Sequence, residues 1–290
     1  MLFVEAEPSP KRRRWKRMSD AKKRLPHYES PPVVEVVCGI QFESLKELLA
    51  PHLGLLWERY KLEYPSCEEA APLAKVIERV GDASPEIGID LVDRPPLPRV
   101  FFVRADGTRL IQVQRDRFLH NWKRVKKEDE YPRYGMVISL FRQHLQTFEK
   151  FLRDKGLGSL KANQYEMSYV NQIPMGEGWS SLSDIGSVFP DFAWRKDQRY
   201  FLPAFEASHW RTAFPLQDGL GRLHVSMRQG ATKEDPRLSL LFELTVRGMG
   251  TDTSRAAMWD WFGTAREWIV RGFTDLTGES IQKNVWKRRR

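Results

Sequence analysis

The chain of 290 residues is long enough for one large domain or two small ones, and a hydrophobic content of 41% allows an ample core. No apolar run reaches the length that spans a bilayer, and no signal peptide opens the chain, so we expect a cytoplasmic protein. The two cysteines, Cys38 and Cys67, lack CxxC spacing and are too few for a disulfide scaffold or a cysteine-based zinc site.

The net charge of +9 is concentrated at the two ends of the chain. Residues 1–25 carry nine basic and three acidic side chains, a net of +6, and the last ten residues carry five basic and no acidic ones, which leaves −2 for the body. Such ends bind phosphates without sequence specificity, or they are disordered tails. The candidate nucleic-acid contacts are Lys11, Arg12, Arg13, Arg14, Lys16, Arg17, Lys287, Arg288, Arg289 and Arg290. Met18 is an alternative start, which would remove residues 1–17.

The first elements are a strand over Val33–Phe42 and a helix over Leu45–Tyr60 that Pro51 interrupts. Every second position of the strand is apolar, which predicts a half-buried strand. A long connection rich in Pro, Gly and Asp follows over residues 81–98.

Three strands of a meander are predicted between Arg99 and Trp122. Val100–Val103 is β-branched or aromatic, and the Asp106-Gly107 pair is a favoured hairpin turn. Leu110–Gln114 returns with alternating apolar and amide side chains, and Phe118–Trp122 forms the third strand. We expect one apolar face, and an opposite face that carries the amides together with His120.

A helix over Tyr134–Lys155 that ends at Gly156, and a strand over Gln164–Ile173, complete the first half. The second half has strands near 205–214, 222–229 and 237–247, and a closing helix that begins near Thr253 or Ser254. The predicted fold class is α+β, with two mainly antiparallel sheets whose helices pack on one face. The predicted divisions are a tail over 1–25, a ferredoxin-like half over 26–175, a linker over 176–203, a meander plus a long C-terminal helix over 204–286, and a tail over 287–290.

Four motifs carry a family resemblance: PPVVEVVCGIQF at 31–42, VFFVRADGTRLIQVQRDRFLHNWKR at 100–124, YPRY at 131–134 and YVNQIP at 169–174. Together they resemble a sporadically distributed, functionally uncharacterised prokaryotic family of conserved hypothetical proteins, over roughly residues 26–286. The resemblance implies a prokaryotic cytosolic protein, and the patchy distribution implies carriage on mobile or defence-related gene clusters. It brings no catalytic residue.

Two groups of polar residues are candidate sites. The first is a ligand or partner surface on the first sheet, made of Glu35, Gln112, Gln114, His120, Asn121 and Asn171, with Glu166 nearby. His120 beside a carboxylate would suit a general base, although such a histidine is more often structural. The second group, on the second sheet, is His224, Arg228, Glu243 and Arg247, with Ser226 and Thr245 between them. It is either a set of cross-strand ion pairs or a surface for an anion or a partner.

The sequence contains no GxxxxGK[ST] or GxGxxG phosphate-binding loop, no GxSxG nucleophile elbow and no HExxH zinc-binding motif. The six histidines are scattered, so we expect no cofactor and no metal. The favoured hypothesis is a non-enzymatic interaction protein that binds a protein partner encoded nearby or a small ligand. One alternative is a nucleic-acid-binding protein that uses the basic termini. The other is a hydrolase or nuclease centred on His120.

Overall fold

One antiparallel sheet of nine strands dominates the fold, in the order β2-β5-β6-β7-β1-β8-β11-β10-β9. The computed structural model describes residues 24–78, 86–88, 97–193, 201–203, 205–230 and 237–289. The strands of the sheet are β1 (Val33–Phe42), β2 (Ser66–Ala70), β5 (Arg99–Val103), β6 (Arg109–Gln114), β7 (Arg117–Lys123), β8 (Ala162–Pro174), β9 (His209–Pro215), β10 (Arg222–Gly230) and β11 (Ser239–Gly248). A separate hairpin pairs β3 (Lys75–Ile77) with β4 (Glu86–Gly88).

The helices are α1 (Ala50–Trp57), α2 (Arg133–Asp154), α3 (Ile185–Val188), α4 (Arg255–Leu276) and α5 (Glu279–Asn284). Short 3-10 turns lie at Leu182–Asp184, Pro190–Phe192 and Gln217–Gly219. No helix in the described ranges combines the length and the apolar character that crossing a membrane requires.

The predicted division into two sheets is not confirmed, because β8 joins both halves. This strand of 13 residues pairs with β1 along one edge and with β11 along the other. The order of the sheet therefore reads outward from the β1–β8 pair, through β7, β6, β5 and β2 on one side and β11, β10 and β9 on the other. Each half contributes a three-stranded meander followed by a helix of 22 residues.

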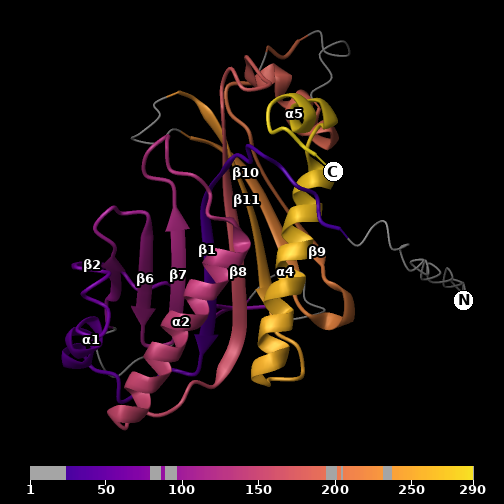
Figure 1. The fold of residues 1–290 in the computed structure, drawn as a ribbon. Helices are drawn as coiled ribbons and strands as arrows, with labels where there is room; N and C mark the ends of the chain where they lie inside the picture. The colour runs from indigo at the N-terminus through magenta and orange to yellow at the C-terminus, as the bar shows by residue number, and fades with distance from the viewer. Residues whose placement is uncertain are drawn as a thin grey trace, which may run out of the picture.

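Both long helices, α2 and α4, lie across the same face of the sheet (Figure 1). Their apolar stripes and the facing strand residues form the core, whose helical members are Val137, Phe141, Leu145, Phe148, Leu152, Met258, Trp261, Phe262, Ala265, Ile269 and Phe273. The three- and four-residue spacing of these side chains places them on one side of each helix. The sheet is thus covered by long helices on one face, and its opposite face is available for polar side chains.

Local signals set the helix ends. The Ser254 hydroxyl accepts a hydrogen bond from the Ala257 amide at 3.2 Å, which satisfies an amide at the start of α4. Gly156 follows α2 with a φ of 65°, a conformation that glycine adopts without steric cost. Pro51 was expected to interrupt its helix, but α1 begins at Ala50 and places Pro51 in the first turn. A missing amide hydrogen costs nothing there, because the first turn has no acceptor for it.

The segment expected to be a linker packs against the sheet in its described part. The Trp179 indole is buried and donates to the Ile173 carbonyl at 3.1 Å. The Trp210 ring on β9 stacks on the Phe192 ring, with 3.9 Å between ring centroids. Trp194, a third tryptophan in or near the predicted linker, lies outside the described residues.

Candidate functional site

The face of the sheet opposite α2 and α4, which we call the open face, carries most of the predicted site residues. Glu35, Gln112 and Asn121 come together there from β1, β6 and β7. The Asn121 amide donates to a Glu35 carboxylate oxygen at 2.6 Å, and the Gln112 amide donates to the Asn121 oxygen at 2.7 Å. Arg99 on β5 then donates to the Gln112 oxygen at 3.2 Å. This part of the first predicted surface is one hydrogen-bonded row across four strands.

His120 does not belong to that row, so its placement beside the amides was wrong. It pairs with Cys38 on β1 and Ile111 on β6, and its side chain has no exposed surface beneath α2. The ring centroid lies 5.2 Å from that of His144, and within the described chain neither ring nitrogen of His120 has a hydrogen-bond partner. Burial lowers the pKa of His120 well below its usual value. The residue is a neutral core histidine, without the solvent access that a general base for hydrolysis needs.

Asn171 also lies on the helix-covered face, in register with Phe242 of β11. Its amide donates to the Phe242 carbonyl at 3.1 Å, and the side chain is 2% exposed. Alternation along β8 fixes this position, because Tyr169 and Ile173 point to the same face. The prediction that Asn171 shares a surface with Glu35 is therefore wrong.

Gln114 holds a segment that crosses the open face. Its side-chain oxygen accepts from the Leu73 amide at 2.9 Å, and its side-chain nitrogen donates to the Leu73 carbonyl at 3.1 Å. Gln164 on β8 accepts from the Glu78 amide at 2.7 Å and donates to the Val76 carbonyl at 2.8 Å. These side-chain amides bond to the backbone as a neighbouring strand would. We call residues 73–78 the strap.

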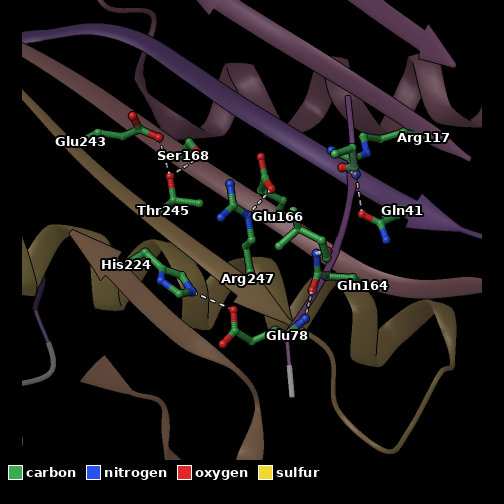
Figure 2. Close-up of polar contacts among 12 residues, drawn as sticks. Gln41, Glu78, Arg117, Gln164, Glu166, Ser168, His224, Glu243, Thr245 and Arg247 are labelled. Carbon is green, nitrogen blue, oxygen red and sulfur yellow. Dashed lines mark hydrogen bonds and ion pairs between the residues drawn. The ribbon is translucent and has the colours of Figure 1, made fainter. Parts of the chain in front are cut away.

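The strap ends at Glu78, whose side chain is 1% exposed. Its carboxylate forms an ion pair with Arg222 on β10. It also shares a hydrogen bond of 2.7 Å with Nε2 of His224 on the same strand (Figure 2). At the other end, the Arg117 guanidinium donates to the Ala74 carbonyl at 3.0 Å. One buried carboxylate thus attaches the strap to the second half of the sheet, and so links the two predicted surfaces.

The second predicted surface lies on the same open face as the first. Arg247 on β11 forms an ion pair with Glu166 on β8, and the Thr245 hydroxyl donates to Glu243 at 3.0 Å (Figure 2). Glu166 and the other nearby carboxylates outweigh the cost of burial and raise the pKa of Arg247. Arg228, further along β10 and exposed, is in register with Leu241. Because there is one sheet, the two predicted surfaces form one continuous polar face.

Two carboxylates flank Val170 at the centre of the open face, beyond the strap. Glu35 on β1 and Glu243 on β11 are both in register with this residue of β8. Neither carboxylate forms an ion pair within the described part of the chain. Burial raises the pKa of Glu35 against the opposing effects of the Asn121 hydrogen bond and the positive charge of Lys123, and the negative charge of Glu243 adds to the rise. We call Glu35 and Glu243 the carboxylate pair; the sequence signalled each residue separately but not that β8 would place them together.

The basic termini are described only in part. Lys11–Arg17 and Arg290 lie outside the described residues. Arg289 binds Glu29 through two hydrogen bonds of 2.6 and 2.9 Å, and Arg288 donates to the Gln282 oxygen at 2.8 Å. Lys287 donates to the Asn284 carbonyl at 2.6 Å. The described basic residues at the C-terminus are therefore held by neighbouring groups.

Comparison of the sequence with protein-family models and with curated proteins finds no match. No three His, Cys, Asp or Glu side chains gather as metal ligands would within the described ranges. The open face carries carboxylates, amides and guanidinium groups that are joined by hydrogen bonds and ion pairs.

Proposed function

We propose that the protein is a non-enzymatic interaction protein whose open face binds a protein partner. The partner places a basic side chain between Glu35 and Glu243. We further propose that this partner is encoded nearby, in a mobile or defence-related gene cluster of a prokaryote, and that binding takes place in the cytoplasm.

The carboxylate pair is the observation that carries this proposal. The negative charge of Glu243 acts on the half-buried carboxylate of Glu35 and favours its neutral form, and a lysine or arginine between the two side chains would relieve that repulsion. Val170 supplies apolar surface between the two charges, in keeping with protein interfaces that combine apolar contact with a few polar anchors. Charge complementarity of this kind directs association and sets the orientation of the partner.

Native co-purification tests the proposal. We expect the wild-type chain to retain a stoichiometric protein partner from its own host, and the double variant Glu35→Gln/Glu243→Gln to lose it. Glutamine keeps the size and the hydrogen-bonding capacity of the side chain, so the folded sheet should be retained. Loss of charge at both anchors should weaken binding by roughly 10-fold or more, as for other charged interface contacts.

Glu68→Gln/Glu69→Gln is the matched control, because both residues are exposed on the edge strand β2 of the same sheet. Equal retention of the partner by both double variants would overturn the proposal. The same would follow if the wild-type chain purified without a partner.

Nucleic-acid binding through the basic termini stays a prediction. Its signature is an affinity that falls steeply with salt and is lost when residues 1–25 and 287–290 are removed.

The ferredoxin-like interpretation of the first half is likewise a proposal, supported by the order β8-β1-β7-β6 with α1 and α2 as the two connecting helices.

A further inference from the structure

A cavity of about 100 Å³ lies on the helix-covered face, between the start of α2, the middle of α4, strand β8 and the segment before β1. Three segments that stand out in the sequence meet at its walls: Pro31–Val33, Tyr131–Tyr134, and β8 at Tyr169 and Asn171. It is separated from the carboxylate pair by the sheet itself, so an inference about it goes beyond the proposed function.

Arg266 on α4 gives the cavity a positive charge. The guanidinium lies over the Tyr134 ring, 4.5 Å from its centroid. Burial raises the pKa of Tyr131, Tyr134 and Tyr169, and the positive charge of Arg266 opposes part of that rise. Arg266 is half-buried and forms no ion pair with a carboxylate in the described part of the chain. A partly desolvated cation without a counter-ion favours an anionic ligand.

Tyrosine hydroxyls add hydrogen-bond donors. Burial raises the pKa of Tyr131 and of Tyr134 to about 12, so both hydroxyls stay protonated at neutral pH. The Tyr131 and Tyr169 hydroxyls are 2.9 Å apart and share one hydrogen bond. No hydrogen bond engages the Tyr134 hydroxyl within the ranges described, which leaves it available to a ligand.

Asn171 supplies an acceptor in the same cavity. Its nitrogen donates to the Phe242 carbonyl, and its oxygen accepts no bond from any described residue. Ile269 and Phe273 make the adjoining wall apolar. An apolar cavity of about 150 Å³ holds the six heavy atoms of benzene, so about 100 Å³ suits a ligand of roughly four to five heavy atoms.

We propose that this cavity binds a short hydroxycarboxylate. The carboxylate contacts the Arg266 guanidinium and the Tyr134 hydroxyl, and the ligand hydroxyl donates to the Asn171 oxygen. The ligand needs a negative charge at one end and a hydrogen-bond donor at the other. Chloride lacks the donor and a simple alcohol lacks the charge, so neither satisfies both ends of the site.

Calorimetric titration of the full chain with glycolate tests this assignment, and glycolamide serves as the neutral isostere. We expect saturable binding of glycolate at millimolar concentrations and no binding of glycolamide. Arg266→Gln should weaken glycolate binding by about 10-fold or more, and Tyr134→Phe by about 3- to 10-fold, because a charged contact outweighs a neutral one.

Arg142→Gln is the matched control, since Arg142 also lies over an aromatic ring, that of Trp259 at 4.4 Å, and does not line the cavity. It should bind glycolate as the wild type does. Absence of saturable glycolate binding, equal binding of glycolamide, or unchanged binding by a folded Tyr134→Phe variant would each overturn the assignment. Tyr134→Phe keeps the test valid should Arg266→Gln fail to fold.

Discussion

Acid should destabilise this fold through His144, a buried residue of α2 that lies beside Tyr64 and His120. Its side chain is 3% exposed, and its Nε2 shares a hydrogen bond of 2.8 Å with the Tyr64 hydroxyl. Burial, aided by the positive charge of Arg109, lowers the pKa of His144 from 6.5 to about 4. The native state therefore keeps the imidazole neutral under conditions in which the unfolded chain binds a proton.

The sign and the size of the effect follow from this difference. A depressed native pKa gives stability that is fully present above pH 6.5 and is lost as the pH falls toward 4. Between pH 7 and pH 5, linkage through His144 alone removes about 2 kcal/mol from the free energy of unfolding. The buried His120, whose pKa is also lowered, acts in the same direction.

Urea unfolding at pH 7 and pH 5 measures this loss, with His144→Gln as the comparison. Glutamine retains hydrogen-bonding capacity toward the Tyr64 hydroxyl and does not titrate. The free energy of unfolding of the variant should fall by about 2 kcal/mol less than that of the wild type over this range. Equal pH dependence of the two proteins would refute the assignment of His144 as a neutral buried group.

Three further predictions concern the strap and the backbone. Gln164→Met removes the hydrogen bonds to the Glu78 amide and the Val76 carbonyl, so the free energy of unfolding should fall by about 1–3 kcal/mol. The Glu78 amide should also exchange its hydrogen with solvent faster. An unchanged exchange rate would contradict the role of these bonds in holding the strap. Gly221→Ala should destabilise the protein by more than about 2 kcal/mol in thermal unfolding, because the added Cβ would lie 1.9 Å from the Arg247 carbonyl oxygen. Gly263→Ala in α4 is the control: its Cβ meets no atom, and alanine should stabilise the helix by about 1 kcal/mol. The reverse order of stability would count against the packing described. Ser254→Ala should cost about 1 kcal/mol by the same measurement, and no change would mean that the cap of α4 is not used.

Elements with a strong periodic signal could be predicted from the sequence, and pairings between distant strands could not. The repeat of apolar residues in α2 and the alternation in β11 are local properties, and both elements appear with only small shifts at their ends. That β8 bonds to β1 and to β11 at once depends on contacts far apart in the chain, which no local pattern encodes. The sequence therefore suggested two sheets where the structure has one.

The candidate site shows the same division. Glu35, Gln112 and Asn121 were grouped in one predicted surface, and the structure joins them by hydrogen bonds. The same group held His120 beside Asn121, although neighbours along a strand point to opposite faces. His120 was misplaced although Phe118 and Trp122, two positions away on either side, already indicated the apolar face. The strap was missed because residues 73–78 have no periodic pattern. Its strand β3 pairs with β4 and not with the nine-stranded sheet, to which side-chain amides attach it.

The accessibility of Val170 tests the central claim that the open face is where the partner binds. In a Cys67→Ser background, which leaves only the buried Cys38, Val170→Cys places a thiol between Glu35 and Glu243. Lys150→Cys, on the exposed side of α2, provides the reference. We expect maleimide to label Cys at position 170 readily in the isolated chain and slowly in the complex purified from the host, with position 150 unaffected. An unreactive position 170 in the isolated chain, or protection of position 150 instead, would contradict the account.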